Sequence, residues 1–174
     1  MPYETLHTET VYHGRAFNVR RDEIRLPDGK AAWLDIVDHV GAVTLVPVDD
    51  QNRVWFVRQY RHAAGEVLLE LPAGTVEPGE PPLDCARREI REEIGMAAGR
   101  IELIGEYFLA PGYSTEFMHV FLATDLRPDP LPGDPDEFIS AEAIPLDVVL
   151  RMVENGKIRD AKTLASLMLA KKYL

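Results

Sequence analysis

Residues 74–96 read Gly-Thr-Val-Glu-Pro-Gly-Glu-Pro-Pro-Leu-Asp-Cys-Ala-Arg-Arg-Glu-Ile-Arg-Glu-Glu-Ile-Gly-Met. The glycines and prolines at the start predict a loop. A helix is expected from Pro81 or Pro82, because proline fits a first helical turn, where its missing N–H would be unpaired anyway. Gly95 is expected to end that helix as a left-handed cap. The stretch therefore predicts a loop, one helix and a sharp stop.

One side of the predicted helix is apolar, with a spacing of three and four residues that joins Leu83, Ala86, Ile90 and Ile94. Glu89, Glu92 and Glu93 fall within a wedge of about 100° beside this stripe. Three carboxylates at the edge of a core repel one another and lose hydration, which is costly unless cations bind there. Hard oxygen ligands of this kind suit Mg²⁺ or Mn²⁺.

The same pattern has a simpler interpretation, a solvated helix face with salt bridges such as Arg88 to Glu92. The spacing argues against it, because the stretch resembles, at every fixed place, the Nudix box G-x5-E-x7-R-E-U-x-E-E-x-G-U, where U is a large aliphatic residue. A chance match has a probability on the order of one in 10⁸ per starting position. The fixed places are filled by Gly74, Glu80, Arg88, Glu89, Ile90, Glu92, Glu93, Gly95 and Met96.

The whole chain has 174 residues, which fits one domain with a sizeable core and room for a small additional subdomain. No apolar run has the length of a membrane span and no signal pattern begins the chain, so a cytoplasmic location without membrane contact is expected. Cys85 is the single cysteine, which excludes an internal disulfide and a cysteine-based zinc site. The net charge of −10 argues against nucleic-acid binding.

Strand and turn patterns surround the central helix. A turn is expected at 27–30 and a proline-rich loop at 127–136. The order predicts the α+β class, with a mixed sheet layered between helices. Residues 1–40 form an antiparallel sheet too thin to be stable alone, and residues 41–174 form the main domain. Strands are expected at 3–12, 17–26, 31–40, 41–48, 53–60, 68–72, 101–109, 117–124 and 137–144, and further helices at 145–154 and 160–173.

The resemblance to Nudix hydrolases implies an α/β/α sandwich and cleavage of a nucleoside diphosphate linked to another moiety. Pro111, sixteen residues beyond Gly95, marks the ADP-ribose pyrophosphatase subfamily, and the segments 58–61, 70–74 and 110–114 are similar to that subfamily. The resemblance thus implies hydrolysis of ADP-ribose to AMP and ribose 5-phosphate. It also implies a homodimer that exchanges the N-terminal sheet between subunits.

Carried over residue by residue, the resemblance implies two or three Mg²⁺ ions per site, with Mn²⁺ as the alternative. Glu89 and Glu93 would be the main ligands, Glu92 would share an ion, and the Ala73 carbonyl would add an oxygen. Arg88 would hold the carboxylates in position, and Glu80 would support them or reach an ion through water. The nucleoside diphosphate sugar would contact Arg58, Arg61, Glu70, Pro111 and Gly112, although charges at 58–61 also suit a protected edge strand.

The proton acceptor for the attacking water is expected outside the box, because bound cations make carboxylates poor bases. Glu137 is the candidate, since it ends the proline-rich loop in a Glu-x-Ile pattern that resembles the catalytic loop of ADP-ribose pyrophosphatases. Asp136 and Glu116 are the competing residues. The alternative is an acidic loop tip that only aids solubility.

Three other functions remain as alternatives. In the first, the substrate is another nucleoside diphosphate sugar, such as GDP-mannose, or a dinucleotide. The box does not recognise the base or the sugar, so it does not distinguish these substrates. A ligand-sensing Nudix module would bind a nucleotide without cutting it, and a scaffold would only oligomerise. Every carboxylate of the box is present, which favours the enzyme.

Overall fold

The computed structural model describes residues 3–133, 135 and 137–174, and the chain divides into two compact units. The first unit contains the N-terminal residues up to Gly41 together with Tyr107–Phe117. The second unit contains Ala42–Glu106 and Met118–Leu174. Among the described residues, none of the helices combines the length and the apolar character that a membrane span requires.

The first unit is an antiparallel sheet in the order β1-β2-β3, with the strands β1 (Glu4–His13), β2 (Asn18–Arg25) and β3 (Ala31–Asp38). The predicted turn before β3 is present: Gly29 has a φ of 85°, and the Lys30 N–H donates to Oδ1 of Asp28 at 3.1 Å. The second segment of the unit lies beside β3, where the Val37 N–H donates to the carbonyl of Tyr113 at 2.7 Å. The unit therefore joins two segments that are distant in sequence.

Much of the apolar surface of this sheet is exposed. Every residue of β1 is exposed, and of the hydrophobic side chains described in the unit, Ile24 is the one that is fully buried. Exposed apolar surface gathered on one small sheet is typical of protein–protein contacts. The exposed large hydrophobic residues on it are Tyr3, Leu6, Val11, Tyr12, Phe17, Trp33, Leu34 and Val40.

The second unit contains two sheets in the orders β7-β4-β9-β8 and β10-β5-β6. β4 pairs parallel with β9 and antiparallel with β7, so the larger sheet is mixed. The strands are β4 (Ala42–Pro47), β5 (Arg53–Arg61), β6 (Glu66–Glu70), β7 (Ala73–Thr75), β8 (Met96–Phe108), β9 (Phe117–Pro128) and β10 (Ile139–Pro145).

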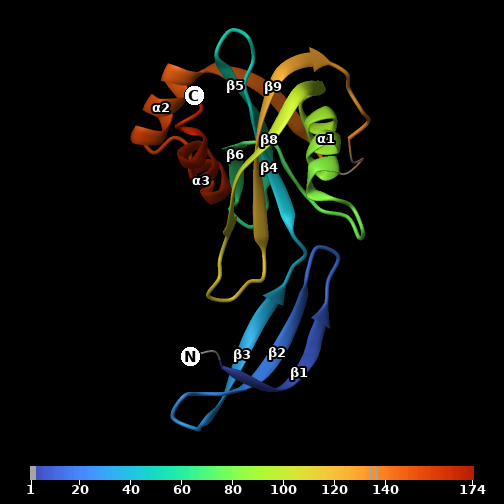
Figure 1. Cartoon of the computed structure of the whole chain (residues 1–174), viewed down its shortest axis with the longest axis vertical. Coiled ribbons are helices and arrows are strands. Elements are labelled where there is room, and N and C mark those ends of the chain that lie inside the picture. The colour runs from blue at the N-terminus through green and yellow to red at the C-terminus, as the bar shows by residue number, and fades with distance from the viewer. Residues whose placement is uncertain (1–2, 134, 136) are drawn as a thin grey trace. The chain divides into compact units, whose positions relative to one another are not determined.

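Helices cover these sheets on both sides. The helices are α1 (Pro82–Glu93), α2 (Leu146–Glu154) and α3 (Ala161–Ala170). Figure 1 shows α1 on one side and α2 and α3 on the other. This confirms the predicted α+β class with an α/β/α sandwich.

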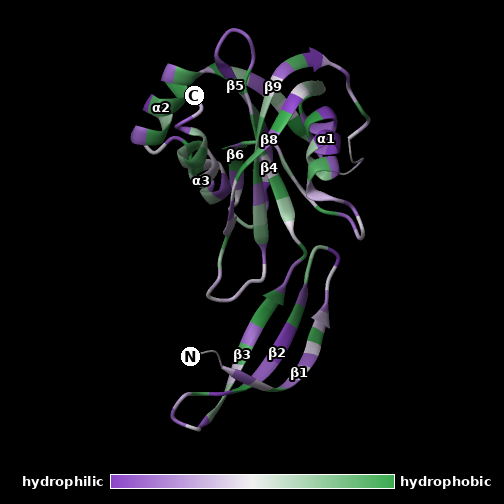
Figure 2. Ribbon diagram, in the orientation of Figure 1, coloured by the Kyte–Doolittle hydropathy of each residue, from purple (hydrophilic) through white to green (hydrophobic). Residues whose placement is uncertain are grey.

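The core fixes α1 on the sheet. Ala86 and Ile90 of α1 belong to the same buried cluster as Val43 and Leu45 of β4 and Phe121 of β9. Burying a side chain such as that of Ile90 stabilises the fold by roughly 1.5–3 kcal/mol. Figure 2 shows hydrophilic and hydrophobic residues interspersed along α1, as expected for a helix with one buried face. The carboxylates beside this face are therefore held next to the sheet.

Several boundaries differ from the prediction. Gly74 lies in β7, paired with β4, and not in a loop. β8 begins at Met96 and not at Ile101, because Gly95, with a φ of 70°, turns the chain directly from α1 into the strand. β5 is the middle strand of its sheet, so the charges at 58–61 do not protect an edge.

Candidate active site

A glycine allows the carboxyl group of Glu89 to lie against β7. A Cβ atom at Gly74 would be 1.8 Å from Oε1 of Glu89 and 1.9 Å from its Cδ, far closer than any real contact. Glu89 is only 8% exposed. The glycine that begins the box motif is therefore required by the close approach of a carboxyl group to the strand.

Arg88 lies at the centre of three carboxylates. Its Nε and Nη2 donate to the two oxygens of Glu80, each at 3.1 Å. Its Nη1 donates to Glu89 at 2.6 Å and to Glu92 at 2.9 Å. The hydrogen bonds with Glu80 are the main cause of a raised pKa at Arg88 and a lowered pKa at Glu80. Arg88 thus links three acidic side chains, and its supporting role at a metal site stays a prediction.

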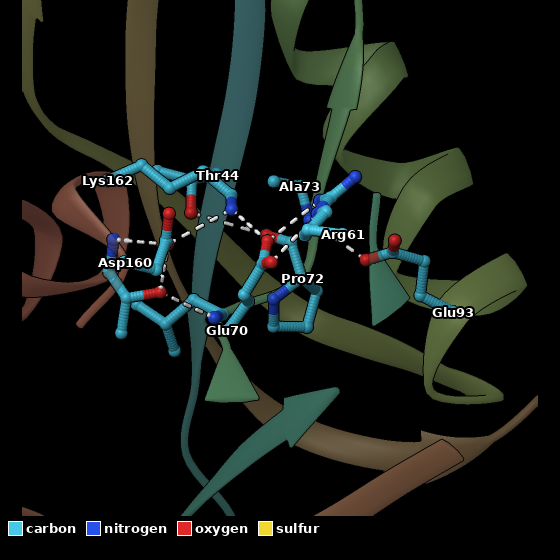
Figure 3. A network of polar contacts seen from close by, with 10 residues as sticks. Thr44, Arg61, Glu70, Pro72, Ala73, Glu93, Asp160 and Lys162 are labelled. Atoms are coloured by element: carbon cyan, nitrogen blue, oxygen red, sulfur yellow. Dashed lines mark hydrogen bonds and ion pairs between the residues drawn. The ribbon is translucent and has the colours of Figure 1, made fainter. Parts of the chain in front are cut away.

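Glu93 lies beside Ala73, the residue predicted to contribute a carbonyl ligand. The Ala73 N–H donates to Oε2 of Glu93 at 2.8 Å (Figure 3). Burial raises the pKa of Glu93 to about 8, against the hydrogen bond from Ala73. Burial likewise raises the pKa of Glu89 to about 7, against the charge and the hydrogen bond of Arg88, and the charge of Glu92 adds to the increase. Two carboxyl groups here therefore resist ionisation as long as no metal ion binds beside them.

These residues fit a divalent cation by donor type and by charge. Glu89, Glu92 and Glu93 supply the hard carboxylate oxygens that Mg²⁺ prefers, and a cation would remove the cost of ionising the two with raised pKa values. Within the part of the chain that the structure describes, no three acidic, histidine or cysteine side chains are arranged as a ligand set. The guanidinium of Arg88 is shared between Glu89 and Glu92 instead.

The hairpin of β5 and β6 brings Arg61 and Glu70 together. Nε and Nη2 of Arg61 donate to the two carboxylate oxygens of Glu70 at 2.8 and 2.7 Å. The Glu70 side chain is 1% exposed and that of Arg61 is 42% exposed. Both were predicted as substrate contacts. Because Glu70 takes up one edge of the guanidinium, Arg61 would bind a phosphate through its remaining N–H groups.

α3 contributes a lysine that the sequence analysis did not assign. Nζ of Lys162 pairs with Oε2 of Glu70, and with Oδ2 of Asp160 at 3.0 Å (Figure 3). The sequence predicted Asp160 as the cap of this helix, and Asp160 does accept a hydrogen bond from the Thr163 N–H. Nothing local indicates that Lys162 faces Glu70, which lies 92 residues earlier.

The other predicted substrate contacts are spread over both units. Arg58 forms an ion pair with Glu142 of the adjacent strand β10, with 2.5 Å between Nε and Oε1. Pro111 and Gly112 belong to the first unit, in a turn where the Tyr113 N–H donates to the Ala110 carbonyl at 3.1 Å. A Cβ at Gly112 would meet no atom within 4 Å.

Glu137, the predicted base, is exposed and lies just before β10. Its charge is among the causes of the raised pKa values of Glu89 and Glu93, so its carboxylate lies within electrostatic reach of both. The competing residue Glu116 belongs to the first unit. Asp136, the other competitor, is outside the described residues.

Two family models match the chain. The model described as NUDIX domain matches residues 38–167, and the model described as nucleoside diphosphate sugar hydrolase N-terminal domain matches residues 3–33. An ADP-ribose pyrophosphatase of Bacillus subtilis (strain 168) is 35% identical over 162 residues, which cover 92% of this chain and 88% of that protein.

An ADP-ribose pyrophosphatase of Mycobacterium tuberculosis (strain ATCC 25618 / H37Rv) is 44% identical over 126 residues, which cover 72% of this chain and 61% of that protein. A crystal structure of an ADP compounds hydrolase superposes with a TM-score of 0.89 at 26% identity. That match covers 100% of this chain and 95% of the other.

Proposed function

The chain belongs to the Nudix family and is a Nudix hydrolase, and from this premise we propose that it hydrolyses the diphosphate bond of ADP-ribose to AMP and ribose 5-phosphate. The observation that carries diphosphate hydrolysis is the position of two partly desolvated carboxyl groups of α1: that of Glu89 lies against Gly74 of β7 and accepts a hydrogen bond from Arg88, and that of Glu93 accepts one from the Ala73 N–H. The names of the relatives from Bacillus subtilis and Mycobacterium tuberculosis support ADP-ribose as the substrate.

Glu89, Glu92, Glu93 and the Ala73 carbonyl are the groups that would hold Mg²⁺, two or three ions per site, with Mn²⁺ as an alternative. Bound there, the ions would neutralise the diphosphate and lower the pKa of a water molecule. Arg88 would hold Glu89 and Glu92 in a fixed orientation through its hydrogen bonds to them.

Glu137 would accept the proton of the attacking water. Support comes from its charge, which acts on both Glu89 and Glu93, and from its exposed position outside α1. A carboxylate outside the set of metal ligands keeps the basicity that a metal ligand loses. Arg61 would orient a phosphate group with the N–H groups that Glu70 leaves open. Substrate contacts by Arg58, Pro111 and Gly112 stay predictions.

A homodimer is the proposed assembly, with residues 1–40 exchanged between subunits. Support comes from the hydrophobic side chains that the β1–β3 sheet exposes, including Trp33 and Tyr12. The cytoplasmic location stays a prediction from the sequence.

A panel of substrates tests the proposed function. ADP-ribose, GDP-mannose and a dinucleotide are incubated with the enzyme and Mg²⁺, and the products are separated by chromatography. ADP-ribose should show the highest kcat/KM. A preference for GDP-mannose would reassign the substrate, and tight binding of ADP-ribose without turnover would indicate a sensing module.

A further inference from the structure

Glu70 is the buried centre of a charged cluster that connects α3 with β5. Its side chain is 1% exposed, accepts two hydrogen bonds from Arg61 and also pairs with Lys162. Lys162 is only 12% exposed and pairs in turn with Asp160. Figure 3 shows the order Asp160, Lys162, Glu70 and Arg61 across the site. The cluster therefore ends, on the side away from α3, at the arginine proposed to meet the substrate.

The first turn of α3 holds Lys162 in place. Oδ2 of Asp160 accepts hydrogen bonds from the N–H of Thr163 at 2.9 Å and from its hydroxyl at 2.6 Å. The same hydroxyl accepts a hydrogen bond from the Leu71 N–H at 2.8 Å. Thr163 is fully buried, so its hydrogen bonds to Asp160 and Leu71 are shielded from water where α3 meets the segment after β6. Lys162, the residue before Thr163, is thus held next to the segment that leads to β7.

The charges of the four residues Arg61, Glu70, Asp160 and Lys162 balance. Arg61 and Lys162 carry one positive charge each, and Glu70 and Asp160 one negative charge each. Without Lys162 the cluster would carry a net negative charge beside the proposed diphosphate site, and Arg61 alone would compensate the buried Glu70. Hydrogen bonds from Arg61 and the charge of Lys162 outweigh the effect of burial and lower the pKa of Glu70, so the carboxylate stays ionised.

We propose that Lys162 is a positioning residue for substrate binding: by balancing the buried Glu70, it keeps the guanidinium of Arg61 oriented and available to an anionic diphosphate. The inference rests on the proposed function, because it takes a diphosphate as the ligand. A salt bridge with a purely structural role would affect stability and leave KM unchanged. KM and thermal stability therefore separate the two roles.

The test compares Lys162→Met with Lys171→Met, an exposed lysine at the C-terminal end of α3. Lys162→Met should raise KM for ADP-ribose about tenfold, as expected for loss of a binding interaction, and should change kcat less than KM, although the charge of Lys162 also acts on Glu93. Lys162→Arg should recover most of the affinity, and Lys171→Met should match the wild type. If Lys162→Met melts below the assay temperature, Lys162→Gln replaces it, with the same expected KM.

A double-mutant cycle tests whether Lys162 acts through Glu70. In a Glu70→Gln background, the further change Lys162→Met should alter KM by less than about twofold. A folded Lys162→Met protein with wild-type KM overturns the inference, and so does a full tenfold effect that persists in the Glu70→Gln background.

Calorimetry with inorganic pyrophosphate separates failure of this inference from failure of the proposed function. Lys162→Met should weaken pyrophosphate binding about tenfold, whichever nucleoside diphosphate derivative the enzyme cleaves. Equal affinities in wild type and variant overturn the role of Lys162. A wild type that does not cleave ADP-ribose, but whose pyrophosphate affinity depends on Lys162, overturns only the choice of substrate.

Discussion

Replacing Gly74 with alanine would put a methyl group where the Glu89 carboxyl group lies. The new Cβ would be 1.8 Å from Oε1, and real Cβ contacts are essentially never shorter than 3.0 Å, so the carboxyl group must retreat by about 1.2 Å, the difference between these distances. The end of a flexible side chain can yield in this way while the strand stays in place. Misplacing a catalytic group by about 1 Å can cost about 10²-fold in rate. We therefore expect Gly74→Ala to lower kcat about 10²-fold while Tm changes by only about 3 °C.

The assay measures kcat on ADP-ribose at saturating Mg²⁺, together with thermal melting. Gly133→Ala is the matched control, because its Cβ would lie 3.5 Å from the Glu92 carbonyl oxygen, an ordinary contact. The control should retain activity within about twofold. Wild-type activity in Gly74→Ala would refute the assignment of Glu89. Unfolding of that variant would refute the claim that the side chain alone yields.

Three further predictions concern protonation, the base and assembly. In the presence of a chelator, the free energy of unfolding should fall as pH rises from 4.5 to about 8. Folding raises the pKa of Glu93 from 4.5 to about 8, so the folded state binds this proton more tightly than the unfolded state does, and that stabilisation is lost as the carboxyl group ionises. Melting curves should show this loss, and Mg²⁺ should reverse it; melting temperatures that do not change with pH would contradict the burial of this carboxyl group. Glu137→Gln should lower kcat about 10²–10⁴-fold and leave metal and substrate binding nearly intact, as measured by steady-state kinetics and calorimetry. An unchanged kcat would exclude Glu137 and make Glu116→Gln the next variant to test. Light scattering should give the mass of a homodimer, and an active monomer would count against the exchanged N-terminal sheet.

Local patterns in the sequence predicted most of the fold. The strand predicted at 41–48 is present as β4, in which every residue is buried, and the three/four spacing around Ile90 lies on the buried face of α1. The start of β8 and the short strand β7 were missed, since pairing with neighbouring strands decides whether such segments are extended. Gly74 is an example: the sequence predicts it in a loop, but in the structure it lies in β7 and pairs with β4.

The candidate site was predictable where its residues share one helix. Glu89, Glu92 and Arg88 lie within one turn of α1, so their spacing alone brings them together. Contacts between distant segments were not predictable. The sequence gives no local sign that Lys162 reaches Glu70, because this contact depends on how α3 packs on the sheet. It also gives no sign that Glu70 binds the guanidinium of Arg61, because that contact depends on the pairing of β5 with β6.

The most direct test compares wild type and Glu93→Gln on ADP-ribose with Mg²⁺, with AMP and ribose 5-phosphate quantified by chromatography. The substitution keeps the shape of the side chain and removes its charge. The wild type should release the two products in equal amounts, and Glu93→Gln should do so at least about 10²-fold more slowly. Equal rates in the two proteins would contradict a metal-dependent hydrolase built on the carboxylates of α1.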